Sequence, residues 1–135
     1  MVAALGNFVI LGEPVSGLRA RMGSHGGWYL PSKVAKYKEK IAWEIKTQAK
    51  NLYFYQGEPL KVEMTFFLPK KTKKSTITSR PDLDNLEKPV LDALQGVLFD
   101  NDSQIIEQSS RKRYSNRPRI EITIKKSDYG HEFVD

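Results

Sequence analysis

The chain has 135 residues, of which 39% are hydrophobic, which is enough for one domain with a buried core. It contains no cysteine, which excludes disulfides, thiol nucleophiles and zinc–thiolate sites. The uncharged run 1–12 is too short to span a bilayer and lacks a secretory signal's basic start, so a cytoplasmic protein without membrane contact is expected.

The net charge of +6 is concentrated in two segments. Residues 69–80 carry five basic residues and no acid, and residues 111–119 carry five more. The rest of the chain then has 12 bases against 16 acids. Localised basic patches favour a polyanion partner, although lysine at an exposed strand edge also discourages aggregation.

The first half of the chain predicts a strand, a loop and a helix. Residues 8–11 are a short apolar strand. Residues 12–27 hold five of the nine glycines and predict a mobile, basic loop. A helix is expected from Pro31-Ser32 onward, because apolar residues recur there at three- and four-residue steps: Val34, Tyr37, Ile41 and Ile45.

The second half predicts strands around one more helix. Residues 60–68 alternate between apolar and polar side chains, as a half-buried strand does, and the basic loop 69–81 follows. Helical spacing begins at Leu86 and stops at Gly96. Extended segments are expected at residues 97–99, 105–114 and 120–124, before a weakly ordered tail at 127–135. This order predicts a single α+β domain of two layers, with two main helices over a mixed or mostly antiparallel sheet.

Three aspartates stand out in the segment "RPDLDNLEKPVLDALQGVLFDNDSQI". Asp82 and Asp84 would project to one side of an extended chain, since side chains alternate there. A helix after them, followed by an extended return from residues 96 to 101, could bring Asp102 beside them. Such an all-oxygen cluster would suit magnesium or manganese, and surrounding basic loops would bring in a phosphodiester.

Other interpretations of the acidic residues remain at this point. Neither Asp82 nor Asp100 starts an EF-hand pattern, and the chain leaves little room for the donor-binding domain of a nucleotide-sugar transferase. The structural alternative stays open: Asp84 or Asn85 as a helix N-cap, and residues 100–102 as turn formers.

The same segment resembles the signature of the RusA-type Holliday junction resolvases, which are widespread in phages and prophages. The resemblance is carried by D-x-D-N-x-x-K, the following D-A-L-x-G and the later D-x-Q, and with the flanking elements it covers most of residues 8–125. It implies a homodimeric, magnesium-dependent endonuclease that nicks four-way DNA junctions symmetrically. Manganese could substitute, and no small-molecule cofactor is implied.

The resemblance also implies roles for single residues. Asp82, Asp84 and Asp102 would bind the metal, and Lys88 would be a catalytic lysine at the scissile phosphate. The side chains expected to bind DNA are those of Arg19, Arg21, Lys70, Lys71, Lys73, Lys74, Arg80, Arg111, Lys112 and Arg113.

Some positions depart from the motif or receive no site role. Pro89 falls inside the motif helix and could redirect Lys88, and Asn101 replaces the first of two aspartates in many relatives. Asp92 is expected to make a helix-surface or dimer contact. His25 and His131 follow no pattern and receive no role. Two other functions remain alternatives: a non-catalytic DNA-binding accessory, and a metal nuclease acting on flaps or RNA.

Overall fold

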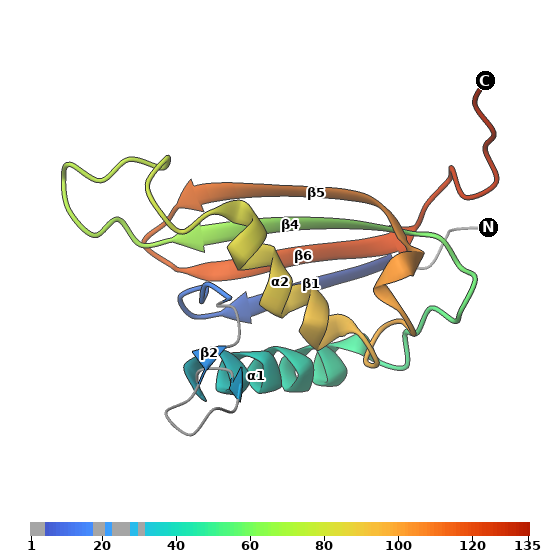
Figure 1. The fold of residues 1–135 in the computed structure, drawn as a ribbon, viewed down its shortest axis with the longest axis horizontal. Coiled ribbons are helices and arrows are strands. Elements are labelled where there is room, and N and C mark those ends of the chain that lie inside the picture. The colour runs from blue at the N-terminus through green and yellow to red at the C-terminus, as the bar shows by residue number, and fades with distance from the viewer. Residues whose placement is uncertain (1–4, 18–20, 23–27, 30–31) are drawn as a thin grey trace.

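A computed structural model describes residues 5–17, 21–22, 28–29 and 32–135 of the chain (Figure 1). Its elements, in chain order, are β1 (Leu5–Leu11), β2 (Arg21–Met22), β3 (Trp28–Tyr29), α1 (Ser32–Ala49), β4 (Leu60–Leu68), α2 (Leu83–Leu94), the short 3-10 helix η1 (Asp102–Gln104), β5 (Ile105–Tyr114) and β6 (Arg119–Lys126). Within these described ranges, no helix is both long and apolar enough to cross a membrane.

Four long strands form a mixed sheet in the order β1-β6-β4-β5. The β4–β5 pair is parallel, and β6 runs antiparallel to both β1 and β4. In Figure 1, α2 crosses the sheet obliquely and α1 runs beside β1, and buried residues of both helices pack with those of the sheet in one core. The prediction of a two-layer α+β fold with a mixed sheet is therefore confirmed.

Alternation along the strands builds the core between the two layers. Residues of β4 alternate between buried and half-buried side chains, so that Val62, Met64 and Phe66 face the helices. Ile41 and Ile45 of α1 are fully buried. Each such side chain contributes about 1.5–3 kcal/mol by leaving water, so the sequence period alone fixes which face of the sheet α1 and α2 cover.

The β1 edge of the sheet is closed by side chains of α1. The Gln48 amide exchanges two hydrogen bonds with the Val9 backbone, accepting at 3.3 Å and donating at 3.0 Å. The ammonium of Lys40 donates to the Leu11 carbonyl. These contacts satisfy backbone groups that an edge strand would otherwise present to another chain.

Three local expectations differ from the structure. Part of the expected mobile loop is packed, because Pro14 and Gly17 are buried, and a two-stranded hairpin of β2 and β3 follows. Residues 97–99 form a turn, closed by a bond from the Gly96 amide to the Phe99 carbonyl (2.7 Å). Ser127, in the expected weak tail, is buried and its amide donates to Pro59 (2.8 Å).

Candidate active site

The acidic motif lies at the junction where the chain enters α2. Asp82 is the N-cap residue, with an extended backbone, and its carboxylate makes no capping hydrogen bond. Asp84 lies in the first turn and accepts a bond from the Asn85 amide at 3.0 Å. Neither Asp84 nor Asn85 is therefore the N-cap, and the two aspartates flank a helix start instead of sharing an extended strand.

The chemistry available at this helix start is electrostatic. The first backbone N–H groups of a helix lack helical acceptors and carry partial positive charge, which stabilises nearby anions. Lys88 follows Asp84 by four residues and therefore lies on the same face of α2. Asp82, Asp84 and Lys88 are all exposed, and none forms an ion pair with another described residue.

Asp102 lies at the opposite end of α2. Its amide donates to the side chain of Gln95, the C-cap residue of that helix, at 3.3 Å. The 12 residues of α2 span about 18 Å. Strand β5 gives a second estimate of the distance between Asp82 and Asp102. Its residue Lys112 donates to the Pro81 carbonyl, next to Asp82, whereas its first residue, Ile105, lies three residues after Asp102. Residues 105–112 of a strand span about 23 Å.

The expected convergence of three aspartates therefore does not occur within one chain. The sequence argument needed an extended return from residues 96 to 101, but the turn at 96–99 keeps the chain beside the end of α2. No group of three His, Asp or Glu side chains able to hold a metal occurs in the described part of the chain. One copy supplies two carboxylates at the start of α2, a lysine one turn further along the helix, and a third carboxylate at the other end.

Gln104, the last residue of the D-x-Q motif, has a structural role. Its buried side-chain oxygen accepts from the amides of Asp100 and Asn101, both at 3.0 Å. Its nitrogen lies within hydrogen-bonding distance of the carbonyls of Phe54, Tyr55 and Glu58 at 2.9–3.4 Å. Gln104 thus fixes the turn that carries Asp102 against the segment between α1 and β4.

Asp100 has a structural role in the same turn, as the alternative for residues 100–102 expected. Its carboxylate accepts from the Tyr53 hydroxyl at 2.5 Å and from the Gln56 amide at 2.6 Å. The bond to Asp100 raises the pKa of Tyr53. Asn101 caps η1 and forms a capping box with Gln104. Of the two aspartates in this turn, Asp100 therefore has a structural role, whereas the Asp102 side chain is exposed.

Pro89 docks another segment onto α2. Proline has no N–H, so the Asn85 carbonyl four residues earlier has no helical donor. The Gly17 amide donates to that carbonyl at 2.6 Å. A Cβ on Gly17 would lie 2.9 Å from the Pro89 ring, so only glycine fits this approach. The proline that departs from the motif therefore attaches the segment after β1 to the helix that carries Asp84 and Lys88.

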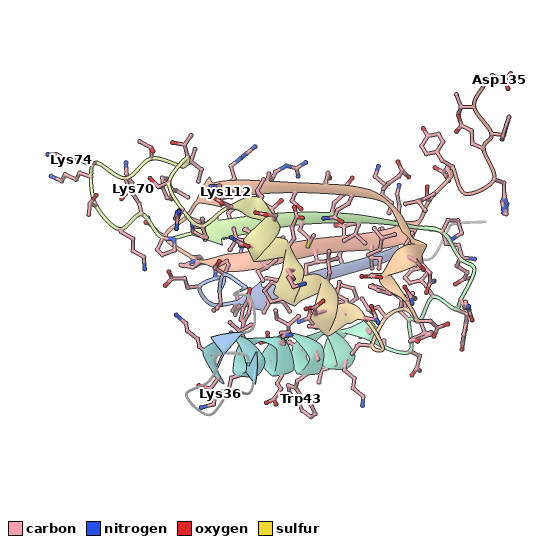
Figure 2. The ribbon with its side chains drawn as sticks, in the orientation of Figure 1. Lys36, Trp43, Lys70, Lys74, Lys112 and Asp135 are labelled. Atoms are coloured by element: carbon pink, nitrogen blue, oxygen red, sulfur yellow. The ribbon has the colours of Figure 1, made fainter. Side chains whose placement is uncertain are left out.

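Lys112 of β5 holds the backbone just before α2. Its ammonium donates to the carbonyls of Ser79 and Pro81, each at 3.1 Å, and Figure 2 shows it beside the beginning of that helix. Pro81 immediately precedes Asp82. Sequence reasoning placed Lys112 among DNA-binding residues, because strand alternation alone did not reveal that its side chain points toward α2.

The other residues predicted to bind DNA differ in whether their side chains already contact another described residue. Lys71 forms an ion pair with Glu13 at 2.8 Å, and the ammonium of Lys70 lies 5.9 Å from the Tyr114 ring centre. In Figure 2, Lys70 and Lys74 lie on the loop that extends beyond the end of the sheet. Exposed cations without an ion pair to another described residue are Lys73, Lys74, Arg80, Arg111 and Arg113.

The remaining sequence predictions fall outside the site or outside the described residues. Arg19, His25 and the side chain of Arg21 lie outside the described residues. Asp92 pairs with Lys38 at 3.5 Å, which joins the two helices, and His131 is exposed. Burial raises the pKa of Tyr37, so that phenol stays protonated and offers no anion to the site.

Two exposed carboxylates at a helix start and a lysine one turn further on, near cations that pair with no described carboxylate, form a site suited to a phosphodiester. Comparison with known sequences agrees with that chemistry. The sequence model described as "Endodeoxyribonuclease RusA" matches residues 12–125. The chain belongs to the RusA endodeoxyribonuclease family.

Individual relatives are consistent with this family. The chain is 28% identical over 133 residues to "Uncharacterized protein YqaN" of Bacillus subtilis (strain 168), covering 87% of this chain and 94% of that protein. It is 41% identical over 75 residues to "Crossover junction endodeoxyribonuclease rusA" of Lactococcus phage r1t, covering 53% of this chain and 57% of that protein.

Among solved structures, thiamine monophosphate kinase from Aquifex aeolicus matches 92% of this chain at 13% identity. The match spans only 34% of the kinase chain, with a TM-score of 0.40. A likeness at this level supports neither a shared fold nor a shared function.

Proposed function

We propose that the protein is a magnesium-dependent endonuclease that resolves four-way DNA junctions by paired, symmetric nicks. The observation that carries the proposal is the pair of exposed carboxylates, Asp82 and Asp84, at the start of α2, with Lys88 one turn beyond Asp84 on the same face. Membership of the RusA family and the printed name of the phage relative support the junction as substrate.

The donor set of this end of α2 fits a hard divalent cation. The Asp82 carboxylate makes no capping hydrogen bond to the helix. Among the described residues, the Asp84 carboxylate accepts one bond, from the Asn85 amide. Carboxylate oxygens are the ligands that magnesium and manganese prefer. When bound, the ion would supply Lewis-acid polarisation of the phosphate and a more acidic water.

A second copy of the chain would complete the metal site. Ligand oxygens must lie about 2.1 Å from magnesium, whereas Asp102 is about a helix length away from Asp82 in the same chain. In a two-fold dimer, each end of α2 can meet the opposite end of its counterpart. We infer that Asp82 and Asp84 of one copy act with Asp102 of the partner subunit, which yields two identical sites per dimer.

The chain's own residues would hold and orient the phosphodiester. Lys88 would contact the scissile phosphate and offset the negative charge that develops on it. The exposed cations of loop 69–81, together with Arg111 and Arg113, would grip flanking phosphates. Lys112 would act as a positioning residue, because it holds the backbone just before Asp82.

The direct test is Asp82→Asn on a synthetic four-way junction with magnesium. Cleavage should be lost while junction binding stays equal or becomes tighter, because a negative charge beside the DNA is removed. Asp92→Asn is the matched control, since Asp92 lies on the same helix but pairs with Lys38, and it should still cut. Cleavage by the Asp82 variant at the wild-type rate would refute the assignment.

Substrate panels separate the other functions. A DNA-binding accessory would bind the junction and cut nothing at any magnesium or manganese concentration. A nuclease for flaps or RNA would cut those substrates faster than the junction. Cleavage that is fastest on the junction is the outcome expected here. The cytoplasmic location expected from the sequence stays a prediction.

A further inference from the structure

A cleft of about 770 Å³ opens beside Asp82. Three separate parts of the chain line it: the segment after β1, the first turn of α1 and the start of α2. Its lining residues are Glu13, Pro14, Val15, Ser16, Lys33, Val34, Arg80, Pro81, Asp82 and Asn85. This volume suits a small ligand, since such sites enclose about 300–1,000 Å³, and it is too small for a DNA duplex.

Two acids and two cations line the cleft, and the cations are the groups available to an anionic ligand. Lys33 and Arg80 are exposed and pair with no described carboxylate. Glu13 is held by Lys71 at 2.8 Å, so its charge is already compensated. Asp82 is assigned to the metal. Two cations therefore remain for a ligand that lies next to the metal site.

The apolar part of the cleft favours a ligand with a flat, uncharged portion. Pro14 and Val34 are buried and Val15 is half-buried, so the lining combines apolar side chains with the two cations. The Gly17 amide anchors this segment to the Asn85 carbonyl at 2.6 Å, which keeps the apolar wall against α2. Two cations beside a wall of proline and valine could receive a nucleotide, with its phosphate at the cations and its base against the apolar side chains.

We propose that this cleft binds one unstacked nucleotide of the DNA, adjacent to the phosphodiester that is cut, and that Lys33 binds its phosphate. The proposal rests on the nuclease function above and adds a subsite to it. Enzymes that need access to one nucleotide commonly move it out of the base stack, at least cost where the duplex is already interrupted. Local sequence does not single out Lys33, because Lys33, Lys36 and Lys40 recur at helical spacing, as on a solvated helix face.

Steady-state cleavage of a four-way junction tests the role of Lys33. Lys33→Ala should raise KM about 10-fold with kcat nearly kept, as for loss of one charge-assisted phosphate contact. Lys33→Arg should retain most of the affinity. Lys46→Ala, an equal charge change on an exposed residue in the last turn of α1, should behave as wild type. A Lys33→Ala enzyme equal to Lys46→Ala would overturn the proposal.

A fluorescence measurement tests the bound base without requiring cleavage. A junction carrying 2-aminopurine beside the scissile phosphate is bound to the Asp84→Asn protein, whose altered residue does not line the cleft. Fluorescence should rise on binding, as an unstacked base requires, and Lys33→Ala in that background should lessen the rise. No rise on saturated binding would overturn the subsite. If the wild type cuts the junction but fluorescence does not rise, the subsite fails and the nuclease proposal stands. If the wild type cuts no junction, the nuclease proposal fails, and the subsite beside the cut phosphodiester fails with it.

Discussion

At the scale of single residues, Lys88 has the clearest expected effect on chemistry. It shares a face of α2 with Asp84 and has no described ion-pair partner. Lys88→Ala should lower kcat about 10²-fold with little change in KM, as expected when charge stabilisation of a transition state is lost. Lys36→Ala, on the outer side of α1 in Figure 2, is the matched control and should cut normally. Normal cleavage by the Lys88 variant would remove it from the mechanism.

Gln104 should affect stability instead of chemistry. Gln104→Ala leaves partly buried backbone groups of the 53–59 segment and the 100–101 turn without this partner. The free energy of unfolding should fall by about 2–3 kcal/mol. Gln108→Ala, which removes one exposed bond to Glu87, should cost less than about 1 kcal/mol. Urea denaturation of both variants measures the difference, and equal midpoints would contradict this role.

At the scale of elements, the attachment of the post-β1 segment to α2 separates stability from activity. Pro89→Ala restores a helical N–H that competes with Gly17 for the Asn85 carbonyl. The helix should lose no stability, since alanine favours helices. However, kcat/KM on junctions should fall about 3–10-fold, as for one lost hydrogen bond. A parallel loss of unfolding midpoint and activity would instead indicate simple destabilisation.

The basic loop 69–81 should act through salt-dependent binding. Replacing Lys73 and Lys74 together by alanine should reduce the slope of log K against log salt by about 2, if each contacts one phosphate. The double variant of Lys36 and Lys46 removes the same charge from α1 and should leave the slope unchanged. Junction binding across a salt series measures both, and equal slopes would exclude the loop from the interface.

At the scale of the whole molecule, mixing two inactive variants tests whether copies share a site. Dimers formed between Asp82→Asn and Asp102→Asn chains would contain one intact site and one doubly altered site. Free exchange should therefore restore about a quarter of the wild-type sites. Mixing Asp82→Asn with Asp84→Asn is the control, because every site is then damaged. No recovery in the first mixture would refute the shared site.

Sequence patterns predicted the two-layer fold and the position of the motif, because alternation and helical periodicity record burial directly. They did not predict where Asp102 lies, since six residues can either return along a helix or close a turn, and the bonds of Gln104 decide between these. The hydrogen bonds of Lys112 and Gly17 to the backbone around α2 were not predicted, for a related reason. Their partners are backbone carbonyls far away in the chain, which leave no trace in local spacing.

The length of α2 has a consequence for the safety of the genome that houses such an enzyme. If two copies share a metal site as proposed, a solitary chain would keep its acidic groups too far apart to cut, and a dilute or newly made molecule would leave DNA intact. The rate of cleavage would then depend on how much of the protein is dimeric, and specific activity would decline on dilution. On this proposal, α2 would act as a spacer that makes cleavage depend on the concentration of the protein and on the presence of both subunits.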